Sequence, residues 1–108
     1  MVLGDYNGDG IAAEFVLQTG AGPCGHAPSV LIGLDAHGAL HAMGSIGQTP
    51  GLVLSTPEQW ERLRNGRGAR LVQWACGDHG ADEEETVVVR WVAGEPVGTF
   101  RSRRCRRR

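Results

Sequence analysis

Residues 86–92 read TVVVRWV, and they are followed by AGEP at 93–96 and VGTFR at 97–101. β-Branched residues and tryptophan are favoured in strands. A short connection that contains glycine and lies between two such runs is typical of a hairpin. We therefore predict two antiparallel strands here, and this hairpin indicates an antiparallel β protein.

Further short apolar runs have the same character, since each is bounded by glycine, proline, asparagine or aspartate. The sequence DAHG at 35–38 predicts a second hairpin turn between two of these runs. The runs are residues 11–18, 29–34, 39–43, 51–54 and 70–75. The predicted fold is therefore mostly β (α+β), a small antiparallel sheet of about six or seven short strands.

One short helix is predicted near residues 57–65. Thr56 can cap it, Pro57 stands at the first helical position, and Gln59 stands at the capping-box position. Asn65 and Gly66 are typical of a helix end. A helix of about two turns is marginal alone and must dock on the sheet.

The length of 108 residues fits one small domain. Apolar residues make up 41% and charged residues 21%, a balance that is typical of a globular protein rather than a disordered one. No run approaches the ~20 apolar residues needed to span a bilayer. We expect a single β-rich domain over residues 1–100 and a disordered, arginine-rich tail over residues 101–108, RSRRCRRR.

The formal charge of −1 is the sum of an acidic part and a basic part of the chain. Residues 1–100 hold five arginines against twelve acids, a formal charge of −7, and the last eight residues add six arginines. An acidic body argues against a nucleic-acid-binding fold. The tail can contact polyanions without specificity, or can serve as counter-charge for the acidic run DEEE at 82–85. Its arginines are Arg101, Arg103, Arg104, Arg106, Arg107 and Arg108.

A candidate cation loop stands near the start of the chain, where residues 5–10 read DYNGDG. Asp5, Asn7 and Asp9 place oxygen-bearing side chains at alternate positions, and glycine permits the sharp turn. The backbone carbonyl of Ile11 comes next. Hard cations such as Ca²⁺ take six to eight oxygen ligands. The same Asn-Gly and Asp-Gly pairs also form turns that need no metal.

This D-x-N-x-D-G sequence resembles the calcium loops of EF-hands, dockerins and the FG-GAP/VCBS-type repeats of secreted bacterial proteins. The loop is followed by a predicted strand at residues 11–18, which is more similar to the FG-GAP type, because an EF-hand loop would be followed by a helix. The resemblance implies weak Ca²⁺ binding, because the chain departs from both patterns. The EF-hand glutamate position is Val16 here, and the acid position of the FG-GAP type is Ala13. Glu14 can substitute only if the backbone bends differently.

Two Cys-Gly motifs, C-G-H at 24–26 and C-G-D-H at 76–79, allow three interpretations. A Cys24–Cys76 disulfide would close a long loop and indicate an oxidising compartment. A structural Zn²⁺ site would use Cys24, His26, Cys76 and His79. A thiol-dependent enzyme would use one cysteine as nucleophile beside a histidine. Cys105 would remain free or form an intermolecular bridge.

The sequence as a whole favours a small extracytoplasmic, calcium-binding module without catalytic activity, which binds an unknown protein or glycan partner. The calcium ligands would be Asp5, Asn7, Asp9, Ile11 and Glu14, and the disulfide would be Cys24–Cys76. We expect a periplasmic or secreted location, with a leader that is not present in this chain. The alternatives are a cytoplasmic zinc module whose arginine tail contacts nucleic acid, and a thiol-dependent enzyme.

Overall fold

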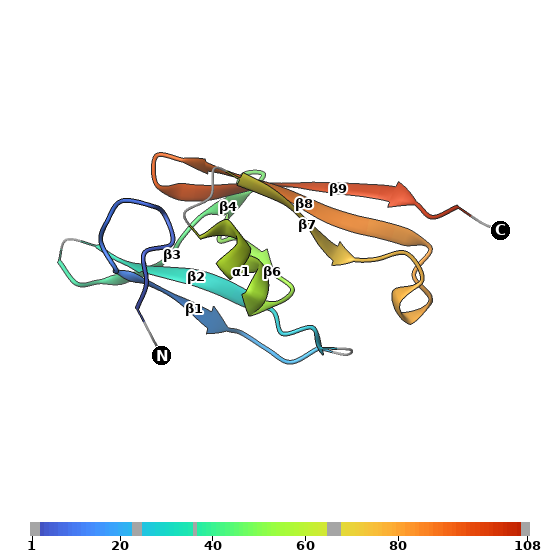
Figure 1. Cartoon of the computed structure of the whole chain (residues 1–108), viewed down its shortest axis with the longest axis horizontal. Coiled ribbons are helices and arrows are strands. Elements are labelled where there is room, and N and C mark those ends of the chain that lie inside the picture. Colours follow the sequence, from blue (N-terminus) through green and yellow to red (C-terminus); the bar gives the residue numbers. More distant parts are fainter. Residues whose placement is uncertain (1–2, 23–24, 36, 65–67, 107–108) are drawn as a thin grey trace.

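A computed structural model describes residues 3–22, 25–35, 37–64 and 68–106. In these residues nine strands form two sheets, and one α-helix contacts both (Figure 1). The first sheet contains β1 (Glu14–Gln18), β2 (Ser29–Leu34), β3 (Leu40–Ala42) and β6 (Val53–Leu54). The second has the order β5 (Thr49–Pro50), β4 (Ser45–Ile46), β9 (Glu95–Arg104), β8 (Glu83–Val92) and β7 (Gly68–Trp74).

The prediction of a mostly β fold with one short helix is confirmed. The strands are more numerous than expected, and they form two sheets instead of one. All paired strands are antiparallel except β4 and β9, which run parallel. The additional strands β4 and β5 are two residues each, too short for a sequence pattern to reveal them.

The β8–β9 hairpin confirms the strands predicted at residues 86–92 and 97–101. Its register runs from Glu83 opposite Arg104 to Val92 opposite Glu95. The turn residues Ala93 and Gly94 have φ of 52° and 79°, the left-handed values that a two-residue hairpin turn uses.

The arginine-rich end of the chain was expected to be a disordered tail, and this is wrong for its first four residues. Strand β9 continues to Arg104, and Figure 1 shows the hairpin extending beyond the first sheet. The acidic run lies directly opposite, and Glu84 Oε1 forms an ion pair with Arg103 at 3.1 Å. Opposite charges on facing strands stabilise the pairing, so Glu84 serves as counter-charge for Arg103. Arg107 and Arg108 lie outside the described residues.

Helix α1 (Pro57–Leu63) begins where the sequence predicts and ends two residues earlier. The Thr56 N–H donates to Gln59 Oε1 at 3.2 Å, which supplies one bond of the expected capping box. Trp60 and Leu63 are fully buried. The Trp60 indole N–H donates to the Ser29 carbonyl at 3.2 Å, and this bond fixes the helix to β2. Asn65 and Gly66 lie outside the described residues.

One apolar core is shared by the helix and both sheets. Gly98 lets the Leu52 side chain pack directly against strand β9, since a Cβ at position 98 would lie 2.7 Å from Leu52 Cδ1. Burial of such side chains supplies most of the favourable free energy of folding. The buried members are Tyr6, Leu31, Met43, Leu52, Leu54, Trp60, Leu63, Leu71, Val87 and Val89.

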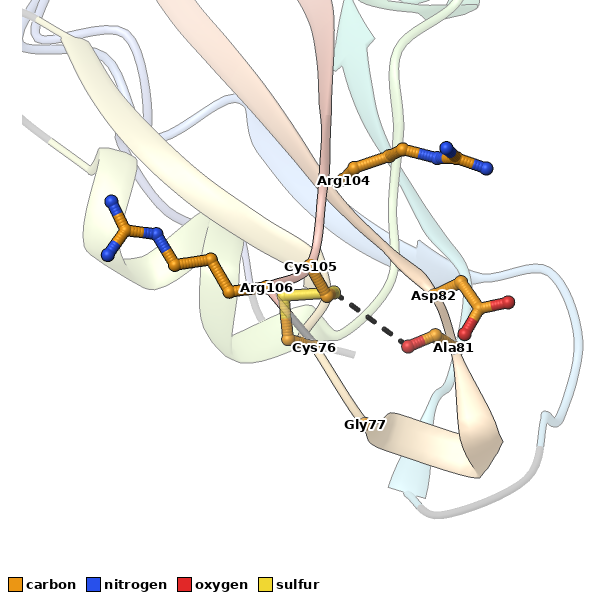
Figure 2. Close-up of a pocket in the computed structure, with 7 residues that line it drawn as sticks. All are labelled: Cys76, Gly77, Ala81, Asp82, Arg104, Cys105 and Arg106. Atoms are coloured by element: carbon orange, nitrogen blue, oxygen red, sulfur yellow. Dashed lines mark hydrogen bonds between the residues drawn. A yellow bond between two sulfur atoms is a disulfide. The ribbon is translucent and has the colours of Figure 1, made fainter. Parts of the chain in front are cut away.

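The disulfide of the structure joins Cys76 to Cys105, with the two Cα atoms 5.6 Å apart (Figure 2). The predicted Cys24–Cys76 pairing and the free Cys105 are therefore wrong, and Cys24 lies outside the described residues. Strands β7 and β9 flank β8, so the segments that follow both strands come together at one end of the sheet. The Cys105 N–H also donates to the Asp82 carbonyl at 2.8 Å, which holds the chain end beside the bridge.

We predict that the double substitution Cys76→Ser/Cys105→Ser lowers the free energy of unfolding by about 3–4 kcal/mol. The bridge spans 29 residues, and the chain-entropy relation gives this magnitude for such a loop. Urea unfolding of the oxidised protein and the variant measures the difference. Cys24→Ser is the control and should leave stability unchanged. An equal loss on Cys24→Ser would support the Cys24–Cys76 pairing instead.

Candidate metal centre

The N-terminal loop is closed at its base by two backbone hydrogen bonds. The Gly4 N–H donates to the Glu14 carbonyl at 2.8 Å, and the Glu14 N–H donates to the Gly4 carbonyl at 3.1 Å. Within the loop, Gly8 and Gly10 have φ of 77° and 84°, a backbone conformation that glycine adopts at little cost. The chain therefore turns sharply enough to return toward its own start.

Backbone N–H groups hold the aspartate side chains of the loop. Asp5 Oδ1 accepts from Gly8 at 2.8 Å, and Asp5 Oδ2 accepts from Gly10 at 2.9 Å. Asp9 Oδ1 accepts from Ile11 at 2.8 Å. These bonds restrict the carboxylates to a few positions, so the loop is organised without an ion.

Glu14 contributes a third carboxylate from the first position of β1. Its side chain is buried, and only 3% of the residue is exposed. Its Oε1 accepts from the N–H groups of Tyr6 at 3.1 Å and Asn7 at 3.3 Å, and its Oε2 accepts from Ala13 at 3.1 Å. Glu14 therefore reaches the loop from the tenth position, through a carboxylate that accepts backbone hydrogen bonds from the loop.

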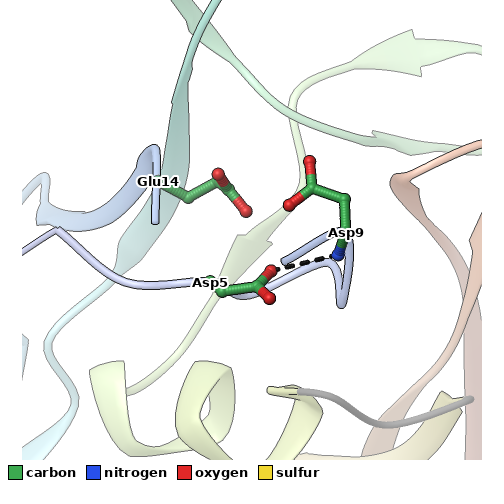
Figure 3. Close-up of side chains that lie close together, drawn as sticks. All are labelled: Asp5, Asp9 and Glu14. Atoms are coloured by element: carbon green, nitrogen blue, oxygen red, sulfur yellow. Dashed lines mark hydrogen bonds between the residues drawn. The ribbon is translucent and has the colours of Figure 1, made fainter. Parts of the chain in front are cut away.

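The three carboxylates converge, as Figure 3 shows. One oxygen each of Asp5, Asp9 and Glu14 can be chosen so that all three lie within 4.8 Å of one another. No ion pair joins any of the three to another described residue. Three like charges at this separation repel, and a buried carboxylate is costly without a counter-charge. The three carboxylates therefore form a group that has the geometry to hold a metal ion.

The other two predicted ligand residues, Asn7 and Ile11, lie in the same loop. Asn7 Oδ1 accepts from the Asp9 N–H at 3.2 Å, and Asn7 Nδ2 donates to the Gly94 carbonyl at 3.4 Å. The Ile11 carbonyl accepts from the Ala13 N–H at 3.0 Å. Asn7 thus connects the loop to the turn of the β8–β9 hairpin.

A cavity of about 710 Å³ borders the loop. Asp9 and Glu14 line one side, and His41 and Glu95 line another. His41 Nε2 lies 3.4 Å from Glu95 Oε1. The opening gives water and small ions a path to the carboxylates.

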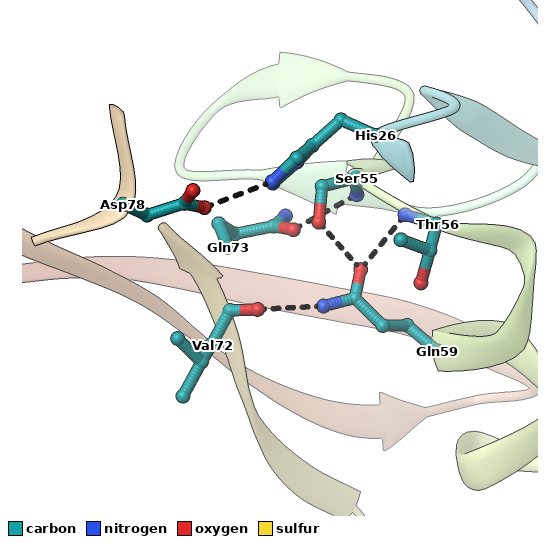
Figure 4. Close-up of polar contacts among 7 residues, drawn as sticks. All are labelled: His26, Ser55, Thr56, Gln59, Val72, Gln73 and Asp78. Carbon is teal, nitrogen blue, oxygen red and sulfur yellow. Dashed lines mark hydrogen bonds and ion pairs between the residues drawn. The ribbon is translucent and has the colours of Figure 1, made fainter. Parts of the chain in front are cut away.

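The two Cys-Gly motifs do meet in the structure, through their histidines. His26 Nε2 lies 3.3 Å from Asp78 Oδ2 (Figure 4). The His26 ring stacks on Trp74 with centroids 4.2 Å apart, and His79 meets the same indole edge-on at 5.9 Å. The sequence indicated neither Trp74 nor Asp78 as a partner, because both contacts are made across the fold.

The disulfide contradicts the predicted zinc site and a thiol-dependent enzyme that uses Cys76 as nucleophile. Its sulfur is bonded to Cys105, so it is not a thiolate that can bind Zn²⁺ or attack a substrate. Cys24, the other predicted sulfur ligand, lies outside the described residues. Two of the four predicted zinc ligands, His26 and His79, contact the same side chain, that of Trp74.

Two buried glutamines beside this cluster were missed by sequence reasoning. Gln59 Oε1 accepts from the Ser55 hydroxyl at 3.1 Å, and Gln59 Nε2 donates to the Val72 carbonyl at 2.8 Å. Gln73 Oε1 accepts from the Ser55 N–H at 2.8 Å (Figure 4). Gln59 thereby satisfies backbone groups at the helix start and on β7.

Comparisons of the chain with family models, with curated proteins and with solved structures give no match. Among the described residues, no helix has the length and apolar character that crossing a membrane requires. The function therefore has to be argued from the geometry of the carboxylate loop.

Tyr6 connects the loop to helix α1. Its hydroxyl donates to Glu61 Oε1 at 2.6 Å, and the Arg64 guanidinium lies 5.2 Å from the ring centroid. Burial, the hydrogen bond to Glu61 and the negative charge of Glu61 raise the pKa of Tyr6 to about 12, while Arg64 acts in the opposite direction. The neutral phenol is thus favoured in the folded state.

We predict that the absorbance of the single tyrosine titrates near pH 12 in the folded protein and near pH 10 when it is unfolded. Because the folded pKa is the higher one, this contribution to stability is complete below pH 10 and is lost as the pH rises to 12. Glu61→Gln should lower the folded pKa. Glu58→Gln, which changes an exposed carboxylate of the same helix, should leave the folded pKa of Tyr6 unchanged. Equal titration of both variants and the parent protein would contradict the role of Glu61.

Proposed function

We propose that this chain is a small extracytoplasmic module that binds Ca²⁺ at its N-terminal loop and acts without catalysis. The observation that carries the proposal is the position of Glu14, whose carboxylate joins those of Asp5 and Asp9 within 4.8 Å. Side-chain oxygens in a glycine-containing loop are the ligands that Ca²⁺ prefers.

The ligands would be the carboxylates of Asp5, Asp9 and Glu14, the amide oxygen of Asn7 and the carbonyl of Ile11. Water from the adjoining cavity can supply the remaining positions of a coordination number of six to eight. The three carboxylates already accept backbone hydrogen bonds, which hold them near one another before an ion binds. Since the twelfth-position glutamate of the EF-hand is absent, we expect a Kd on the order of 10⁻⁴–10⁻³ M.

Two features support the proposed location outside the cytoplasm, the second of which rests on the proposed calcium site. The Cys76–Cys105 disulfide supports an oxidising environment, because such bonds are rare in the cytosol. A millimolar calcium site is useful only where calcium is millimolar, which again favours a location outside the cytoplasm. The cytoplasmic zinc alternative lacks this support because Cys76 is oxidised.

Calcium would strengthen the attachment of the N-terminal segment to the rest of the molecule. The loop is bonded to the hairpin turn through Asn7 and Gly94, and to helix α1 through Tyr6 and Glu61. A cation between the carboxylates removes their repulsion and thereby stabilises both connections.

We predict that isothermal titration detects one Ca²⁺ per chain and that Ca²⁺ raises the melting temperature. At ten times the Kd, mass action gives about 1.4 kcal/mol of added stability. Glu14→Gln should abolish both effects, because it replaces the buried carboxylate at the centre of the cluster. Glu58→Gln is the matched control and should bind as the parent protein does.

Three results would count against calcium binding at this site. The first is the absence of any binding heat at millimolar Ca²⁺. The second is undiminished binding by Glu14→Gln when circular dichroism shows that the variant is folded. The third is equal stabilisation by added NaCl at the same ionic strength, which would reduce the effect to screening.

A further inference from the structure

Strands β7, β8 and β9 present two different faces. The side chains of Leu71, Val87 and Val89 belong to the core, and a Cβ at Gly98 would meet Leu52 and Val87. Successive side chains of a strand alternate between the two faces of a sheet. The residues between these positions therefore point to the opposite side, which we call the outer face.

Four exposed arginines lie on the outer face of these three strands. They are Arg70 of β7, Arg90 of β8, and Arg101 and Arg103 of β9. Between the row of Arg90 and that of Arg103, Glu84 is the one acid at the outer-face positions, and it pairs with Arg103 at 3.1 Å. Glu95, which lies beyond the Arg90 row at the hairpin turn, pairs with His41 at 3.4 Å. Four arginines and one glutamate give this surface a formal charge of +3, although residues 1–100 as a whole are acidic. The other outer-face positions are neutral: Gly68, Val72, Thr86, Val88, Val97 and Thr99.

The register of the strands spreads these arginines over three neighbouring strands and along the strand direction. Arg70 lies in the row of Val88, Arg101 in the row of Thr86, and Arg103 in the row of Glu84. From the row of Arg90 to that of Arg103 is six residues along β8, or roughly 20 Å at the usual rise of a strand. No ion pair joins Arg70, Arg90 or Arg101 to another described residue.

We propose that the outer face of strands β7–β9 binds a linear anionic polysaccharide. A flat surface with guanidinium groups spaced along one direction matches a chain that carries carboxylates or sulfates at intervals. Guanidinium groups bind such anions through paired hydrogen bonds. This proposal goes beyond the calcium site, since none of the loop residues takes part.

Nucleic acid and membrane fit the outer face less well. Single-stranded nucleic acid is held largely by bases stacked on aromatic rings, and none of the outer-face positions is aromatic. Sequence-specific recognition of duplex DNA requires an element that enters a groove, and an exposed sheet face does not offer one. An anionic membrane would require apolar or aromatic side chains to insert beside the charges, whereas the large apolar residues exposed on this face are two short valines, Val72 and Val92.

The test is titration calorimetry of the full chain with oligomeric polyuronate, in EDTA so that calcium is absent. We expect binding that weakens steadily as NaCl is added, because counterions are released. The variant Arg70→Gln/Arg90→Gln should weaken it by about tenfold or more, since two charge contacts are lost. The matched control is Arg62→Gln/Arg104→Gln, which removes the same charge from helix α1 and from the inner side of β9, and it should bind as the parent protein does.

Several outcomes would overturn the proposal. One is no binding of polyuronate at low salt, and another is an equal loss of affinity in the control variant, which would indicate an effect of net charge alone. Tighter binding of single-stranded oligothymidylate of equal charge would assign the face to nucleic acid. Binding of anionic vesicles without binding of polyuronate would assign it to a membrane. Thermal melts of both variants verify that each is folded.

Discussion

The burial of Trp60 between the two sheets is the interaction on which the other features depend. A helix of seven residues is too short to be stable alone, so it exists because its apolar side chains enter the shared core. Trp60 also donates its indole proton to Ser29 of the first sheet. The same core contains Tyr6, and the Tyr6 hydroxyl is bonded to Glu61 of the helix. Core burial therefore places the start of the carboxylate loop.

The β8–β9 hairpin connects the features that lie at different ends of the molecule. Its turn accepts a hydrogen bond from Asn7 of the carboxylate loop. Its far end pairs acidic with basic residues and is followed by the Cys76–Cys105 bridge. Its outer side contributes three of the four arginines that face away from the core. One long hairpin thus gives a fixed spatial relation to a candidate cation site, a covalent bridge and a basic surface.

The parts of the fold that could be predicted are those whose signal is local. The strand 86–92 was recognisable from its β-branched residues, and the helix start from Thr56, Pro57 and Gln59. The loop at residues 5–10 was recognisable from its spacing of oxygens and glycines. The partner of Cys76 was predicted wrongly, because two plausible cysteines remained and sequence separation does not show which strand ends meet. The sequence predicts a tail for the arginine-rich segment, because its local composition does not show that the acidic run of β8 pairs with it.

The sequence by itself determined the mostly β class, the helix with its N-terminus, and the three loop positions that offer oxygens. Each depends on residues within a few positions of one another, where propensity and hydrogen bonding act directly. Only the tertiary structure decided that Glu14 joins Asp5 and Asp9, that Cys76 is bonded to Cys105, and that Arg70 and Arg90 share a face with the arginines of β9. These relations depend on strand register and on how the two sheets close around the core, and both are set by the packing of residues far apart in the chain.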